Sequence, residues 1–324
     1  MSVGTARLAK RRSGLAAGQR RFILSVTIPT ILYGSIGLLT IGWAVALMLF
    51  EYSPGRAGGL ILGLGGSNPF VGLEHFGNMI GGVSLEARLF RTSLTNTLIF
   101  AFIVLPLNLI ITLPLAALIE SVRGRLKIAF RAIYFLPVVT SSVGVALMWR
   151  YLYDPQHGLF NAVIRLLGGT PVAWLSDPQA EFLGVSVSMW AVIAAYLWQD
   201  YGYNLVIFIA ALQGIPREFK EAALIDGANA WQAFIKVTVP LLRPTLLFVC
   251  VMTMLSSFQV FDIIQVMTRG EPNNQTRVLV LDIYENAFRF QRMGWAAAAA
   301  FVLVAVVMIV TVAQMRLLRT QWEY

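Results

Sequence analysis

Two apolar stretches of the chain carry polar side chains at helical spacing. In the stretch 182–212, one face of a helix would hold Tyr196, Asp200 and Tyr203, with Trp198, Gln199 and Asn204 nearby. In the stretch 242–266, one face would hold Thr253, Ser256 and Ser257. Hydroxyls, a carboxylate and aromatic rings suit a polyhydroxylated solute, because oxygens exchange hydrogen bonds with its hydroxyls and rings stack on its C–H faces. The chemistry predicted is reversible binding, with these residues lining a path.

A structural interpretation of the same residues remains open. Ser and Thr in membrane helices often bond to the backbone or to a neighbouring helix, and Tyr and Trp are enriched at membrane interfaces. Asp200 differs from the others, because an unpaired carboxylate deep in an apolar helix is costly and needs a partner or a role. Asp262 lies near the outer end of its stretch, where it can reach water, and is assigned to the interface.

Other chemistries find little support in the residue inventory. Cys250 is the single cysteine, and the two histidines, His75 and His157, are expected in loops, so no metal site is predicted. No GxxxxGK[ST] phosphate loop is present, so the chain is expected to bind neither ATP nor another cofactor itself. The net charge of +9 comes from scattered basic residues, which fits contact with membrane lipids and not with nucleic acid.

The elements that must position these side chains are membrane-spanning helices. Of the 324 residues, 57% are hydrophobic and 13% are charged, well below the roughly 25% charged content of a soluble domain. A helix needs about 20 apolar residues to cross the hydrocarbon layer. The sequence predicts an all-α integral membrane protein with six spans, at about 23–50, 94–118, 132–152, 182–212, 242–266 and 294–315.

The distribution of Lys and Arg predicts the orientation. Six basic residues and no acid precede the first span, and further basic residues follow the second, fourth and sixth spans, so both termini are expected in the cytoplasm. The chain is divided into a basic cytoplasmic tail (1–22), the first span with an external Gly-rich loop (23–93), and a core transmembrane domain (94–324). This core includes a polar loop at 214–244.

The 214–244 loop contains the most regular pattern in the chain. It includes PREFKEAALIDGANAWQAFIKVTVPLLRP, in which Pro216 and Glu218 favour the start of a helix. Gly227 permits a bend, and an amphipathic stretch follows until Pro240 and Pro244 limit it. Two short helices at an angle, with exposed Ala and Phe side chains, suit docking into a groove of a partner. The alternative is an amphipathic linker lying on the membrane surface.

The spacing EAA-x2-DGA-x5-F-x5-P-x3-P resembles the cytoplasmic coupling loop of the membrane subunits of binding-protein-dependent ABC importers, in the version found in carbohydrate and glycerol-phosphate permeases. The residues that match it are Glu221, Ala222, Ala223, Asp226, Gly227, Ala228, Phe234, Pro240 and Pro244. FVGLEHF at 70–76, YFLPVVTSSVGVALMWRYLYDPQHGLFN at 134–161 and FQVFDIIQVMTRGEPNNQT at 258–276 are similar to other family segments. Gly270-Glu271-Pro272 departs from the usual Gly-Gly-Pro, which affects the expected surface for the binding protein.

The resemblance implies a type I ABC importer permease fold in a bacterial or archaeal cell membrane. It implies a second homologous permease subunit, two ATP-binding subunits that carry ATP and Mg²⁺, and an extracytoplasmic solute-binding protein. The loop residues from Glu221 to Phe234 would contact the ATPase, and the polar faces of 182–212 and 242–266 resemble sugar-contacting positions of maltose-type permeases. The solute implied is a sugar, or a related polyol or glycerol-phosphate compound.

Two other classes of function are kept beside this one. An ion-coupled secondary transporter should contain internal repeats and membrane-embedded charges, and Asp200 is the main acid in its favour. A membrane enzyme would need a catalytic cluster, for which the sequence offers no plausible set of residues.

Overall fold

The structure is a computed structural model that describes residues 3–56 and 67–318. Its helices are α1 (Val3–Leu47), α2 (Glu74–Gly81), α3 (Leu85–Ser121), α4 (Arg125–Phe135), α5 (Ser142–Leu152), α6 (Leu159–Leu166), α7 (Val187–Gln213), α8 (Arg217–Ile225), α9 (Ala230–Ala233), α10 (Val239–Leu241), α11 (Arg243–Phe258), α12 (Asp262–Met267), α13 (Leu279–Tyr284) and α14 (Met293–Leu317). Two π-helical turns follow α9 and α13, at Phe234–Thr238 and Glu285–Arg289. The antiparallel strands β1 (Glu181–Phe182) and β2 (Val185–Ser186) precede α7.

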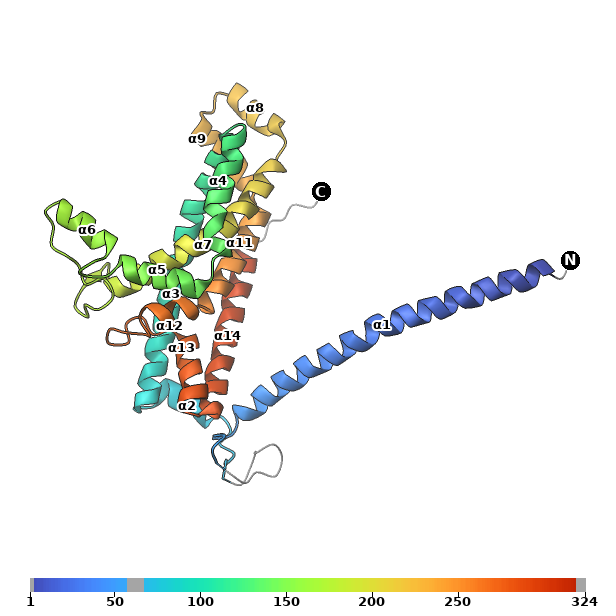
Figure 1. Cartoon of the computed structure of the whole chain (residues 1–324), viewed down its shortest axis with the longest axis horizontal. Coiled ribbons are helices and arrows are strands. Elements are labelled where there is room, and N and C mark those ends of the chain that lie inside the picture. Colours follow the sequence, from blue (N-terminus) through green and yellow to red (C-terminus); the bar gives the residue numbers. More distant parts are fainter. Residues whose placement is uncertain (1–2, 57–66, 319–324) are drawn as a thin grey trace.

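The central helix of the bundle is α3. It pairs most extensively with α7 and also packs against α2, α11 and α13. Ser84 caps its first turn by accepting a hydrogen bond from the Ala87 amide. Its apolar side chains contribute to separate buried clusters along its length, from Phe90 through Phe100 to Leu113. In Figure 1 the bundle carries α8 and α9 at one end and α2 at the other.

Most of the predicted spans correspond to helices. The segments Phe22–Leu47, Leu85–Ser121, Arg243–Met267 and Met293–Leu317 are long and apolar enough to cross a membrane. A fifth crossing is possible if Arg125–Val139 and Ser142–Leu152 count as one bent span. α7 has 27 residues, enough length to cross the hydrocarbon layer, although polar residues interrupt its apolar sequence. The all-α membrane fold predicted from the sequence is confirmed.

The predicted continuous span at 132–152 is wrong, because the structure breaks it. α4 ends at Phe135, a 3₁₀ turn covers Leu136–Val139, and α5 begins at Ser142 after an extended residue, so the two helices differ in direction by 98°. Pro137 lies at the break and is buried; proline lacks an N–H and disfavours a helical residue before it. The apolar composition continues through the break, which is why hydropathy alone missed it.

Other predicted boundaries shift. α1 runs without interruption from Val3 to Leu47, so it joins the predicted tail 1–22 to the first span, which ends earlier than residue 50. The Gly-rich stretch 58–66 lies outside the described residues. α3 begins well before residue 94, and the predicted span 242–266 is interrupted at residues 259–261 between α11 and α12.

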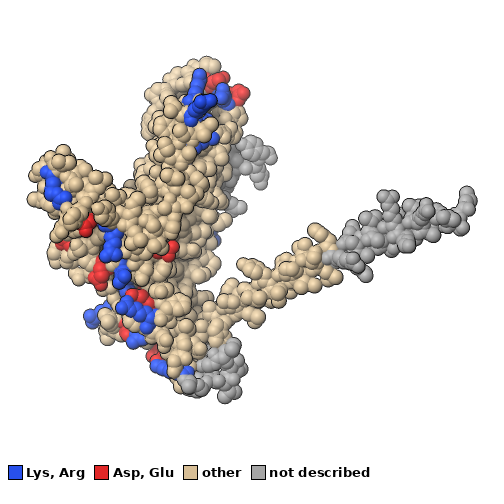
Figure 2. Space-filling view, viewed as in Figure 1, with Lys and Arg blue, Asp and Glu red and all other residues tan. Residues whose placement is uncertain are grey.

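Charge on the surface is distributed as a membrane protein requires. Figure 2 shows charged side chains around α8 and α9 and over the opposite part of the bundle, with a nearly uncharged surface between them on this face. α1 extends away from the bundle in Figure 1. The most apolar 18 residues of its segment Phe22–Leu47 are not buried against the rest of the chain. Such an uncovered apolar helix needs lipid or another protein around it.

Candidate functional site

The two predicted polar faces meet inside the bundle, at a group of side chains that we call the polar junction: Asn108, Asp200, Asn204 and Thr253. The Asn204 Nδ2 atom of α7 donates to Thr253 Oγ1 of α11 at 2.8 Å and to Asn108 Oδ1 of α3 at 2.9 Å. Asn108 Nδ2 donates in turn to Asp200 Oδ2 at 3.0 Å. Asn108, Asn204 and Thr253 are buried, and Asp200 is partly exposed. Asp200 therefore has a hydrogen-bond partner, and this partner is an amide and not a cation.

A second contact between the two faces involves Tyr196. Its hydroxyl lies near the Ser256 and Ser257 side chains. Both serine hydroxyls donate to the Thr253 carbonyl, at 3.0 Å and 2.7 Å, so their protons are used within α11. Their lone pairs remain available as acceptors.

The remaining path candidates on α7 lie apart from the junction. Trp198 packs edge-to-face with Trp149 of α5, and Gln199 donates to the Thr140 carbonyl at 3.0 Å and to Ser142 Oγ at 3.2 Å. These two side chains connect α7 to α5 and to the break before it, which together with α4 we call the broken span. Tyr203 keeps 44% of its surface exposed and is the most open of the predicted path residues on α7. The assignment of all these residues to a solute path stays a prediction.

Sequence reasoning missed two residues that build this region. Asn108 lies between apolar residues in the middle of α3, which is the signal that could have found it, since an amide there needs a partner. Gly202 lets α7 approach the broken span: a Cβ at this position would lie 2.4 Å from the Tyr134 carbonyl oxygen and 2.8 Å from Val138 Cγ2. Nothing in the local sequence around Gly202 indicates this contact.

The 214–244 loop forms two short helices at one end of the bundle (Figure 1). α8 begins at Arg217 directly after Pro216, with Glu218 in its first turn, as predicted. The bend falls at Gly227, whose φ of 84° is a left-handed value that favours glycine. Asn229 and Gln232 then form a reciprocal capping box at the start of α9.

The loop presents an apolar surface that differs from the predicted one. Glu221, Ala222, Asp226 and Gly227 are exposed, while Ala223, Ala228 and Phe234 are partly buried. Phe234 packs against Trp231 and against the cluster around Leu212 and Leu242, so it joins the loop to the bundle. The most exposed large side chains are instead Phe219, Leu224, Ile225 and Trp231.

The base of this loop is fixed by a charged cluster around Glu120, at the end of α3. Lys127 and Arg131 of α4 pair with the Glu120 carboxylate, the latter at 3.0 Å. Gln213, the last residue of α7, donates to the same carboxylate at 3.3 Å. The ends of three helices therefore meet directly before the loop begins.

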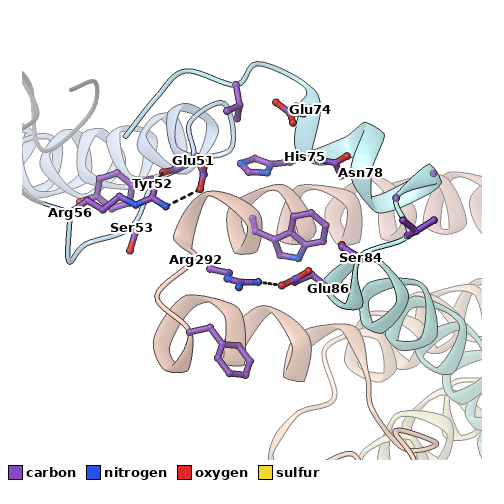
Figure 3. A pocket seen from close by; sticks show the side chains of 16 residues that line it. Glu51, Tyr52, Ser53, Arg56, Glu74, His75, Asn78, Ser84, Glu86 and Arg292 are labelled. Atoms are coloured by element: carbon purple, nitrogen blue, oxygen red, sulfur yellow. Dashed lines mark hydrogen bonds and ion pairs between the residues drawn. The ribbon is translucent and has the colours of Figure 1, made fainter. Parts of the chain in front are cut away.

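At the opposite end of the bundle lies a polar cavity of about 780 Å³, which the sequence did not indicate. Figure 3 shows two ion pairs on its wall, Glu51–Arg56 and Glu86–Arg292. His75 lines the same cavity. The prediction of His75 in a loop is wrong: it lies in α2, is 8% exposed, and places Nε2 3.1 Å from the Phe50 carbonyl oxygen. Packing fixes this histidine.

A buried ion cluster lies between α12 and α14, at α13 and the π-helical turn after it. Arg277 pairs with Asp282 at 2.8 Å and with Glu285 at 2.6 Å. Burial raises the pKa of Asp282, and pairing with Arg277 opposes that shift. Arg277 also lines an open cavity of about 700 Å³ that includes Arg269 and Glu271.

Comparison with known proteins agrees with this architecture. Residues 112–323 match the family model described as "Binding-protein-dependent transport system inner membrane component". The chain belongs to this family. It is therefore a membrane-spanning subunit of an ABC-type transport system, and the family is one of transport subunits, not of enzymes. The family assignment supports the importer interpretation over the ion-coupled alternative.

Individual relatives cover most of the chain. A probable ABC transporter permease protein of Pyrococcus horikoshii is 32% identical over 292 residues, 89% of this chain and 92% of the relative. The trehalose/maltose transport system permease protein of Thermococcus litoralis is 34% identical, over 70% of this chain and 71% of the relative. A chain of a bacterial ABC transporter that imports the acidic polysaccharide alginate has the same fold, with a TM-score of 0.76 at 21% identity, covering 96% of this chain and all of that one.

Proposed function

We propose that this chain is one of two permease subunits of an ATP-driven importer for a sugar, or for a related polyol or glycerol-phosphate compound. The polar junction and the hydroxyls around Tyr196 carry the choice of solute class, because they combine hydroxyl, amide, carboxylate and aromatic groups and contain no buried cation. The named solute of the trehalose/maltose relative is of the same class.

The exposed apolar side chains of the 214–244 loop support the proposed partners. Two ATP-binding subunits, which carry ATP and Mg²⁺, dock on the 214–244 loop, where Trp231 and Ile225 are uncovered. An extracytoplasmic binding protein delivers the solute to the opposite end, and a second homologous permease subunit completes the path. This chain itself binds no cofactor and no nucleic acid. Closure of the ATPase dimer moves the loop and shifts the bundle between inward-facing and outward-facing states.

Reconstitution tests this function. Proteoliposomes that contain both permease chains and the ATPase subunits, with the binding protein outside and ATP inside, are supplied with radiolabelled maltose, trehalose, lactose or sn-glycerol 3-phosphate. The proposal expects uptake of one of these solutes that requires ATP and survives ionophores that collapse proton and sodium gradients. Uptake that needs an ion gradient and not ATP would support a secondary transporter instead.

The proposed location is the cell inner membrane, with both termini in the cytoplasm. Single cysteines at Ala230 and Asn274, in a background with Cys250 replaced, test this orientation. An impermeant thiol reagent is expected to label Asn274→Cys from outside whole cells and Ala230→Cys only after the membrane is opened. Labelling of both from the same side would contradict the six-span topology.

A further inference from the structure

The polar junction connects three helices through Asn204 of α7, which bonds Thr253 of α11 and Asn108 of α3. The Oδ1 atom of Asn108 accepts from Asn204 Nδ2 at 2.9 Å, and its Nδ2 atom donates to Asp200 Oδ2 at 3.0 Å. Thr112, one turn later on α3, donates to the Asn108 main-chain carbonyl at 2.7 Å. The donor from Asn204 determines which end of the Asn108 amide faces Asp200, because only the oxygen of that amide can accept it. Asn108 is fully buried and has little freedom to turn.

The Asp200 carboxylate is held on one side only. Within the part of the chain that the structure describes, Asn108 is the residue that donates to it, and the bond goes to Oδ2. Asp200 is partly exposed, whereas its neighbours in the junction are buried. An ionised carboxylate has capacity for several hydrogen bonds, so Oδ1 keeps its acceptor sites. The arrangement fixes the orientation of the carboxylate and leaves one oxygen for a further donor.

We propose that Asn108 is a positioning residue for solute recognition. It fixes Asp200 so that Oδ1 accepts a hydrogen bond from a hydroxyl of the passing solute. This inference rests on the proposed function, because it requires a solute with hydroxyl donors, and it adds a residue on α3 to a path predicted only on α7 and α11. Asn108 acts through Asp200 and does not touch the solute.

The competing interpretation is that Asn108 only holds helices together, as polar side chains in membrane bundles often do. Asn96 provides a matched control, because it is an asparagine on the same helix, about 18 Å away along the axis. Its Nδ2 atom donates to the main-chain carbonyls of Asn274 at 2.8 Å and Arg277 at 2.9 Å. Asn96→Ala therefore removes an amide that joins α3 to the loop before α13, without touching the junction.

The first experiment is a double-mutant cycle in the reconstituted importer, using the solute of the panel above that it takes up. Asn108→Ala is expected to raise the solute concentration for half-maximal uptake roughly tenfold, as for loss of one hydrogen bond to a charged group. In an Asp200→Ala background the same substitution is expected to have no further effect on that concentration, because the carboxylate that it positions is gone. Equal effects in both backgrounds would overturn the positioning role.

The second experiment needs no solute. In protein labelled with [4-¹³C]aspartate, the infrared band that disappears in Asp200→Asn belongs to Asp200. Asn108→Ala is expected to shift this band, since the side chain loses its donor, and Asn96→Ala is expected to leave it in place. An unshifted band in Asn108→Ala would contradict the contact. If Asn108→Ala does not accumulate, Asn108→Ser keeps a polar side chain that is too short for both bonds, and the same shift is expected.

The failure of this inference is distinguishable from failure of the proposed function. If ATP-driven uptake persists and Asp200→Ala leaves solute affinity unchanged, then the proposed function holds, Asp200 lies outside the path and the inference about Asn108 is wrong. If Asp200→Ala weakens solute affinity and Asn108→Ala does not, then the path is retained and only the role of Asn108 is wrong.

Discussion

The 214–244 loop and the polar junction differ in whether their side chains are already in contact with the rest of the chain. The loop leaves large apolar side chains such as Trp231 and Ile225 uncovered. The junction keeps Asn108, Asn204 and Thr253 buried and bonded to one another. Covering an exposed apolar surface with a partner is favourable, so such a surface favours assembly. A buried network of hydrogen bonds instead stabilises the fold of its own chain. Substitutions in the loop are therefore expected to affect assembly, and substitutions near the junction to affect folding and solute affinity.

The largest effect is expected at Gly202, beside the junction. Gly202→Ala places a Cβ 2.4 Å from the Tyr134 carbonyl oxygen, which is main chain and cannot move aside, so destabilisation of about 3 kcal/mol is expected. The measurement is thermal unfolding of the purified permease complex in detergent. Gly214→Ala, directly after the end of α7, is the control, because its Cβ would approach only the Ala211 carbonyl, at 3.4 Å. Equal melting temperatures for the two variants would contradict the close approach.

A smaller effect is expected at Gly227 in the loop. A β-branched residue at its left-handed φ costs about 1–2 kcal/mol of local strain, enough to displace the bend. Gly227→Val is expected to lower ATP-driven uptake about tenfold while the permease accumulates normally. Gly227→Asn is the control, since asparagine tolerates this region, and it should retain most uptake. No Cβ contact lies within 4 Å, so loss of activity in both variants equally would point away from backbone strain.

The fold and the loop were largely predictable because their signals are local. Continuous apolar stretches gave the helices, and Pro216, Gly227 and the acidic first turn gave the bent loop. The break at residues 136–141 was not predictable from hydropathy, because both of its flanks are apolar. The junction was half predictable: the sequence indicated Asp200, Asn204 and Thr253, but Asn108, which bonds to Asp200 and Asn204, lies more than 90 residues before them in the chain. A bond between distant segments leaves no periodic signal in either one.

Two aromatic residues within the loop sharpen the comparison further. Trp231 is 65% exposed, whereas Phe234, three residues later, packs on the bundle cluster. Trp231→Ala is expected to weaken ATPase copurification by about 2 kcal/mol, as for an interface anchor, without changing the melting temperature of the isolated permease. Phe234→Ala is expected to lower that melting temperature. The reverse pattern would show that the exposed surface is not the docking surface.

The smallest effect is expected from Asp200→Asn, which changes charge and keeps shape. An asparagine oxygen can still accept from Asn108 Nδ2, and its amide group can still bond to a solute hydroxyl. An importer of neutral sugars is therefore expected to retain transport, with solute affinity reduced about fivefold, equivalent to about 1 kcal/mol. Abundance and basal ATP hydrolysis of the assembled complex should be unchanged, because the junction keeps its bonds. An ion-coupled carrier that used Asp200 would lose solute accumulation completely, since an amide cannot take up and release a proton. Residual, ATP-dependent uptake in this variant thus distinguishes a carboxylate that orients a solute from one that carries the driving ion.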